Sequence, residues 1–357
     1  MQIHPALIGI ALVMLAPLQA GALERPDSEF RIFQFPANMI PRIDGDTSDW
    51  DMVPSDYAIG SDQLEDTVRG GGIGPDPSDL DITVRVGWVK GMNRLYFLYE
   101  AYDDYWNMNP SRGDIFEIVV DGDLSGGQFI NNVQLPDWGE NHFRFKGVHA
   151  QNYHIFTPPG EGRDWTMVWG SQPWIKDLPY ANAAYSYSFS AGESGHLVLE
   201  LWITPFDHAP SSGPADAVES RLKESDIIGL SWAVLDYDEN DSQYEGFWNL
   251  SHKTRMDSNA SCQVAFRLMP IEPQYRKNLS AAWDFTVIDM NRRLVAFQDA
   301  STGDIDSWLW DFGDGTTSNV RHPLHSYEKA GDFIVTLTIS GPAGTARFIR
   351  VRDVAVK

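Results

Sequence analysis

Short segments in which apolar residues alternate with polar ones recur along this 357-residue chain, and this period of two constrains the fold more than any other sequence feature. Successive side chains of a β-strand point to opposite faces, so the pattern predicts strands with one buried face. The clearest segments are DITVRVGWV (81–89), RLYFLYEAY (94–102), DIFEIVV (114–120), SYSFS (186–190), HLVLELWI (196–203), IIGLSWAVL (227–235) and CQVAFRL (262–268). The best candidate for a helix is 215–223. We therefore expect an all-β protein built from sandwiches.

The length favours two folding units, because it exceeds that of one average domain. A polar segment of mixed charge, 271–281, follows one series of strands, and a second series begins near Trp283. We expect a larger β-sandwich at 30–270, a linker at 271–281 and a second sandwich at 282–357.

The charge is distributed unevenly between these units. The net charge is −23, and the residues before 271 hold 39 acidic and 17 basic side chains. This surplus argues against nucleic acid or an anionic membrane as a partner. Divalent cations and neutral ligands are compatible with this charge as partners.

The first 22 residues contain no charged side chain, and an apolar run at 6–16 is followed by small residues at 20–22. We expect a cleaved signal peptide, since the run is shorter than the ~20 residues that cross a bilayer. The mature protein would then be secreted, extracellular or at the cell surface, or periplasmic, and would have no membrane span. Cys262 is the single cysteine, so an internal disulfide is excluded, and its place in an alternating strand predicts a buried structural thiol.

The segment WLWDFGDGT (308–316) raises the question of whether Asp311 and Asp314 are working acids. Gly313 and Gly315 can adopt positive φ, and aspartates beside such glycines accept hydrogen bonds from nearby backbone amides. Catalysis would need acids in a cleft at a separation suited to a substrate. We expect a tight turn here, with Trp310 in the core.

The C-terminal segment resembles the polycystic kidney disease (PKD) repeat, an immunoglobulin-like sandwich. The matching motifs are WDFGDG (310–315), H-x-Y (325–327) and GDF-x-V-x-L (331–337). The resemblance covers about the last 75 residues and implies a spacer or interaction module.

The larger unit resembles the family 9 carbohydrate-binding module and the wider DOMON-like sandwiches. The matching pieces, in the order of the family, are IDG-x-x-x-DW (43–50), V-x-V-x-W (84–88), LYF (95–97), YDD (102–104), GD-x-x-EI-x-x-D (113–121), LE-x-x-I-x-P (199–205), IGL (228–230) and Asp236. The resemblance implies that a sugar is held between aromatic faces and polar side chains.

The resemblance transfers unevenly to the ligand-binding residues. Where the family has clamp tryptophans, this sequence has PSR (110–112) and KTRM (253–256). The candidates for ligand contact are Trp106, Arg112, Glu117, Trp138, Arg144 and Trp248. Alternation places Glu117 on one strand face with Ile115 and Val119. Exposed tryptophans around one cleft would favour sugar binding, whereas buried ones would favour a structural surface protein whose two modules contact other proteins.

Two acidic loops suggest a structural Ca²⁺. Oxygen-bearing side chains stand at alternate positions in each loop, with glycines in the first, and Ca²⁺ favours such oxygen ligands. The candidate ligands are Asp121, Asp123, Ser125, Asp236, Asp238 and Asn240. Polar hairpin loops that only tolerate aspartate remain the alternative.

Enzymatic and redox alternatives are disfavoured. The sequence lacks the motifs of serine hydrolases, zinc peptidases and phosphate loops. The neighbours Asp103 and Asp104, at a strand end, are expected to point in opposite directions. A DOMON-like haem site would draw on Met108 and histidines such as His149 and His154, and it ranks third. The sequence therefore predicts a secreted, non-catalytic protein that binds polysaccharide, or acts as an accessory to glycoside hydrolysis, with protein contacts as the alternative.

Overall fold

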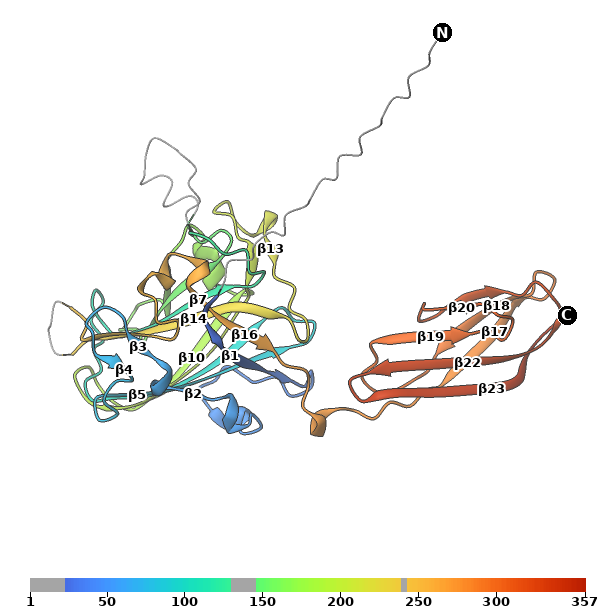
Figure 1. The fold of residues 1–357 in the computed structure, drawn as a ribbon, viewed down its shortest axis with the longest axis horizontal. Helices are drawn as coiled ribbons and strands as arrows, with labels where there is room; N and C mark the ends of the chain where they lie inside the picture. The colour runs from blue at the N-terminus through green and yellow to red at the C-terminus, as the bar shows by residue number, and fades with distance from the viewer. Residues whose placement is uncertain (1–22, 130–145, 239–242) are drawn as a thin grey trace, which may run out of the picture. The chain divides into compact units, whose positions relative to one another are not determined.

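The computed structural model describes residues 23–129, 146–238 and 243–357 and divides the chain into two compact units. The first consists mainly of Pro41–Gly87 and Gly91–Arg267, and the second mainly of Leu268–Lys357. Both are all-β, as the alternation predicted (Figure 1).

Helical structure within the described residues is limited to short 3₁₀ turns. These are η1 (Thr47–Trp50), η2 (Ser55–Tyr57), η3 (Ser61–Gln63), η4 (Pro173–Lys176), η5 (Pro214–Asp216), η6 (Thr254–Asp257), η7 (Ala260–Cys262) and η8 (Pro273–Tyr275). None of them has the length and apolarity to cross a membrane. The expected helix at 215–223 is wrong, because the chain leaves η5 at once and enters the two-residue strand β13 (Val218–Glu219).

The first unit contains strands that overlap every predicted segment, although 186–190 is strand only at its first two residues and 262–268 only from 264 on. They are β1 (Glu24–Phe35), β2 (Ile59–Gly60), β3 (Glu65–Asp66), β4 (Gly72–Ile73), β5 (Leu80–Val89), β6 (Leu95–Asp103), β7 (Ile115–Asp121), β8 (Gln151–Phe156), β9 (Thr166–Val168), β10 (Ala181–Tyr187), β11 (Gly195–Ile203), β12 (Phe206–His208), β13, β14 (Ile227–Asp236), β15 (Gly246–Asn249) and β16 (Val264–Leu268). Strands β10, β11, β6 and β5 are neighbours in one layer, and β16, β14, β7, β8 and β9 follow one another in the other. Strand β1 pairs with both β5 and β16 and so connects the layers.

The core of this unit lies between the two layers. Tyr99 of β6 stacks on Phe116 of β7 with ring centroids 4.4 Å apart, and Phe116 also contacts Trp232 of β14. All three side chains are fully buried. Apolar area removed from water contributes about 25 cal/mol per Å², so this aromatic contact between layers is a major source of stability.

A buried carboxylate anchors the N-terminal segment of the first unit. Glu200 of β11 accepts hydrogen bonds from the backbone amides of Asp44 and Gly45 and from Trp50 Nε1. These partners belong to the motif at 43–50. The motif is therefore structural, because it satisfies an acid that is 0% exposed.

Strand β7 is buried on both of its faces. Phe116 points into the core between the layers, while Ile115 and Val119 pack on the other side in a second apolar cluster. That cluster is completed by Phe129, Ala150, Phe156, Ala233, Leu235, Phe247, Met256 and Ala260. Glu117 alternates with Ile115 and Val119, as predicted, and so lies beneath a cover of loops.

The second unit is a sandwich of a three-stranded and a four-stranded sheet. Its strands are β17 (Trp283–Asp289), β18 (Leu294–Asp299), β19 (Ser307–Asp311), β20 (Thr317–Ser318), β21 (Leu324–Ser326), β22 (Gly331–Gly341) and β23 (Gly344–Val356). Trp310 is 0% exposed and contacts Trp283 and Phe297 in the core, as expected.

The turn at 311–316 is held by its own aspartates. Gly313 donates its amide to Asp311 Oδ1, and Thr316 donates both its amide and its hydroxyl to Asp314 Oδ1. Gly313 and Gly315 have φ angles of 79° and 91°. The two acids form the corners of a turn and are fully engaged there.

Candidate functional site

Glu117 sits at the centre of a polar group on the covered face of β7. It is 3% exposed and accepts a hydrogen bond of 2.8 Å from Asn152 Nδ2 of β8. Burial raises the pKa of Glu117 to about 7, although the Asn152 bond lowers it. Asn152 Oδ1 is buried and lacks a hydrogen-bond partner within the described residues. The pair thus offers an acceptor and a titratable carboxyl in one place.

A histidine and a tryptophan complete this group at its exposed side. His154 lies directly opposite Glu117 in the β7–β8 register, with its Nδ1 4.0 Å from Glu117 Oε2. Its Nδ1 also lies 3.2 Å from Trp169 Nε1, which donates. Burial lowers the pKa of His154 to about 4, so the ring is neutral near pH 7 and carries its proton on Nε2. The Trp169 side chain is 40% exposed. We name Glu117, Asn152, His154 and Trp169 the β7–β8 site.

Two of the tryptophans proposed from the sequence are buried. Trp106 is 1% exposed, stacks on Phe189 at 4.9 Å and donates its indole N–H to Gly195 O. Trp248 is 9% exposed and packs against Gly71 and Gly246. Neither ring presents a free face to a sugar, so these two positions favour a structural role.

The other proposed contacts fall in different places. Glu117 belongs to the β7–β8 site, and Arg112 is exposed in the segment before β7. Trp138 and Arg144 lie outside the described residues. Strand β7 pairs with β14 on one side and β8 on the other, and β8 supplies Asn152 and His154. Sequence reasoning missed Trp169, because the three-residue strand β9 that precedes it is too short to show a period.

A candidate metal centre forms where several strands of the first unit end or begin. Asp103 closes β6, Asp114 precedes β7 and Asp236 closes β14, and one carboxylate oxygen of each lies within 4.8 Å of the others. Asp104 and Asp238 form a second such triad with Asp103, and Asp79 and Glu245 form a third with Asp238. We call these seven side chains the acidic array.

The inner triad of the acidic array is almost fully removed from water. Asp103, Asp114 and Asp236 are each 2% exposed. Burial first, and then the neighbouring carboxylates, raise the pKa of Asp103 to about 7 and that of Asp236 to about 9. Asp236 Oδ1 is buried without a hydrogen-bond partner within the described residues. Hard oxygen ligands that crowd in this way fit Ca²⁺.

The acidic array differs from the sequence-based expectation in one respect, and it includes residues of only one of the two acidic loops. Asp103 and Asp104 bring their oxygens together, rather than apart, because β6 ends at Asp103 and its alternation stops there. Asp236 and Asp238 belong to the array, while Asn240 lies outside the described residues. The inner acids are buried, whereas the two acids of a glycosidase flank the sugar ring that they act on.

The other acidic loop is hydrogen-bonded within itself, although burial and the nearby Asp123 raise the pKa of Asp121 to about 7. Asp121 accepts hydrogen bonds from the amides of Ser125 and Gly126, and Asp123 accepts from the Ser125 amide. The Ser125 hydroxyl also donates to Asp121. These bonds hold the loop in a turn, and Ca²⁺ binding by Asp121, Asp123 and Ser125 stays a prediction.

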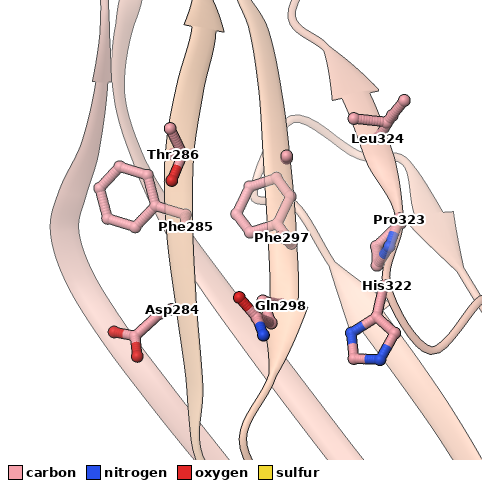
Figure 2. Close-up of a pocket in the computed structure, with 9 residues that line it drawn as sticks. Asp284, Phe285, Thr286, Phe297, Gln298, His322, Pro323 and Leu324 are labelled. Carbon is pink, nitrogen blue, oxygen red and sulfur yellow. The ribbon is translucent and has the colours of Figure 1, made fainter.

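An open pocket lies on the three-stranded sheet of the second unit (Figure 2). Thr286, Ala296 and Leu324 are aligned across β17, β18 and β21, with Asp284, Gln298 and His322 beside them. The Leu324 side chain is 68% exposed. The pocket mixes apolar and polar groups and offers a surface for contacts rather than for catalysis.

Comparisons with known proteins identify the second unit. Residues 291–356 match the family model of the PKD domain. A pre-pro-metalloprotease, PrtV, of Vibrio cholerae is 52% identical over 44 residues, and the collagenase ColQ1 of Bacillus cereus is 48% identical over 42; each match covers 12% of this chain. The chain covers only 5% and 4% of the length of these two proteins.

Solved structures resemble both units. A family 9 carbohydrate-binding module from Caldicellulosiruptor kristjanssonii, in complex with cellotriose, aligns with 69% of this chain and 100% of its own at 14% identity and a TM-score of 0.43. The PKD1 domain of the Vibrio cholerae metalloprotease PrtV aligns with 20% of this chain and 94% of its own at 35% identity and a TM-score of 0.18. The second unit is a PKD domain, and the first is similar to family 9 modules.

Proposed function

We propose that this chain is an exported, non-catalytic carbohydrate-binding protein whose first unit binds an extracellular polysaccharide at the β7–β8 site. The PKD domain would serve as a spacer or as an interaction module. The observation that carries the proposal is the pairing of a half-exposed Trp169 ring with the buried polar atoms of Glu117, Asn152 and His154.

The chemistry of this pairing suits a sugar. A pyranose ring has an apolar face that packs on an aromatic ring, and its hydroxyls need hydrogen-bond partners. Asn152 Oδ1 can accept, His154 Nε2 can donate, and Glu117 can do either near its pKa of about 7. Buried polar atoms without a partner are costly, so a ligand that pairs with them gains affinity.

We also propose that the acidic array holds a structural divalent cation, with Ca²⁺ as the best fit. Asp103, Asp114 and Asp236 would supply its oxygens. The cation would offset the repulsion among these acids and stabilise a domain that has a single cysteine and therefore no internal disulfide.

A structural surface protein that makes only protein contacts remains the second candidate. The burial of Trp106 and Trp248 favours it, and the pocket around Leu324 in the PKD domain offers a contact surface. A haem-binding protein is the third candidate, and a Soret band in the purified protein would decide it.

A glycan-binding screen of the full chain, with and without a chelator, tests the first two candidates. Trp169→Ala and Glu117→Gln should each abolish or weaken binding at least tenfold. Tyr187→Ala is the matched control, since Tyr187 is 43% exposed and lies on β10. If no glycan binds, or if all three variants bind equally, the sugar-binding proposal is wrong.

A further inference from the structure

Two cations beside the β7–β8 site form no ion pair with any acid in the part of the chain that the structure describes, although acidic residues outnumber basic ones 50 to 27 in this chain. Lys146 is 7% exposed, and Arg163 is partly buried against Phe156 with its guanidinium 3.3 Å from the ring centroid. Within the described residues, neither charged group makes an ion pair within 4 Å or a hydrogen bond. Buried lysines are nearly always paired, so this arrangement calls for an explanation.

The position of Lys146 relates it directly to the site. Its Nζ lies 4.9 Å from the centroid of the Trp169 ring, the ring proposed to carry the sugar. Burial is the largest cause that shifts the pKa of Lys146, and it lowers that pKa although Asp257 and Glu117 raise it. Arg163 lies near the same site. Burial is the largest cause that lowers the pKa of His154, and the charges of Arg163 and Lys146 lower it as well.

The acids that face Lys146 do not neutralise it fully. Glu117 and Asp257 are near enough to raise the pKa of Lys146, yet no oxygen of either lies within 4 Å of its Nζ. Glu117 is itself largely protonated below its pKa of about 7. At slightly acidic pH, the protonation of Glu117 therefore leaves Lys146 with less negative charge among the described residues around it.

We propose that the sugar unit bound at the β7–β8 site carries an anionic group, a carboxylate or a sulfate ester, which Lys146 recognises with help from Arg163. The inference rests on the proposed function and adds the substrate class to it. An anion placed beside Lys146 Nζ, at the edge of the Trp169 ring, would restore to the ammonium the charge-assisted hydrogen bonds that burial removed. Trp169 would pack against the ring of the same sugar unit.

Paired ligands that differ only in the anion test the proposal on the full-length protein. Calorimetry would compare trigalacturonic acid with its methyl ester, and a sulfated oligosaccharide with its desulfated form. At pH 6 we expect one anionic ligand to bind at least tenfold more tightly than its neutral counterpart, with the preference shrinking at high salt. Which pair shows the preference distinguishes carboxylate from sulfate.

Substitutions then test whether Lys146 causes the preference for the anionic ligand. Lys146→Met keeps the apolar stem of the side chain, and its affinity for the anionic ligand should fall to its affinity for the neutral form. Lys146→Arg keeps the positive charge and should retain the preference for the anionic ligand. Lys223→Met is the matched control at an exposed lysine. Equal affinity for both members of each pair, or an unchanged preference in a folded Lys146→Met, would overturn the inference. If neutral sugars bind through Trp169 and anionic sugars bind no more tightly, the sugar-binding proposal stands and only the anion inference fails. If no sugar binds, both the sugar-binding proposal and the anion inference are wrong.

Discussion

His325 lies parallel to Phe312 in the PKD domain, with ring centroids 4.1 Å apart and 2° between the planes. The same imidazole places Nε2 2.8 Å from Asp314 Oδ2, which joins the turn to β21. Burial alone would raise the pKa of Asp314, but hydrogen bonds from Thr316 and His325 outweigh it and hold the pKa below its usual value. The turn is therefore held to β21 both by ring stacking between Phe312 and His325 and by the polar contact between Asp314 and His325.

The first prediction concerns this junction. Asp314→Ala removes the acceptor for Thr316 and His325 and should destabilise the PKD domain by about 1–3 kcal/mol. Asp311→Ala, which removes a single amide contact, should cost less. The pKa of Asp314 is lower in the folded protein than in the unfolded chain. Its carboxylate therefore stabilises the folded domain at neutral pH, and this stabilisation is lost as the pH falls through the folded-state pKa. Calorimetric unfolding of the full chain would measure both effects, and equal costs for the two variants would contradict the prediction.

The second prediction contrasts two glycines of the same turn. A Cβ at Gly313 would collide with the backbone carbonyl of Ile334, whereas a Cβ at Gly315 meets no atom within 4 Å. Both residues have positive φ, so alanine at either position costs about 1–2 kcal/mol of strain. Gly313→Ala should cost clearly more, because β22 must also move. Chemical unfolding of the two variants measures the difference, and a larger cost for Gly315→Ala would refute the steric argument.

The third prediction is the pH dependence of the first unit without a cation. Asp103 and Asp236 have pKa values raised to about 7 and about 9. The folded state then holds protons that the unfolded state releases above about pH 4, so stability should fall as the pH rises from about 4 to about 9. Thermal unfolding in a chelator at pH 5.5, 7 and 8.5 tests this, and stability that rises over the range would contradict it.

The fourth prediction adds the cation. At pH 8.5, Ca²⁺ at 100 times its dissociation constant should stabilise the first unit by about 2.7 kcal/mol, and at pH 5.5 by much less, because protons compete for the same oxygens. Asp236→Asn should remove this increment, while Asp216→Asn, outside the array, should keep it. Retention of the full Ca²⁺ effect in Asp236→Asn would place the ion elsewhere.

Strand positions were predictable because burial on one face leaves a period of two in the sequence. Segment 227–235 became β14 and 114–120 became β7 for this reason. The same alternation placed Glu117 with Ile115 and Val119. The PKD turn was predictable as well, since only glycine readily tolerates the backbone of Gly313 and Gly315.

The arrangement of the sites was not predictable, because it depends on contacts between distant segments. Trp106 is buried because Phe189, far along the chain, covers its ring. Asp79 joins Asp238 only through the folding of two separate loops into one place. Trp169 follows a strand of three residues, so no periodicity marked its side chain as exposed.

Strand β7 also limits how the length of this protein can change in related proteins. Its odd-numbered positions hold Glu117 under the loops, and its even-numbered positions hold Phe116 against Tyr99. Deleting a single residue within it would drive the carboxyl group into the aromatic interior and turn the phenyl ring outward. Insertions and deletions among homologues should therefore be confined to the connections on either side of this strand, which keeps the side chains of its two faces in register even where the surrounding loops diverge.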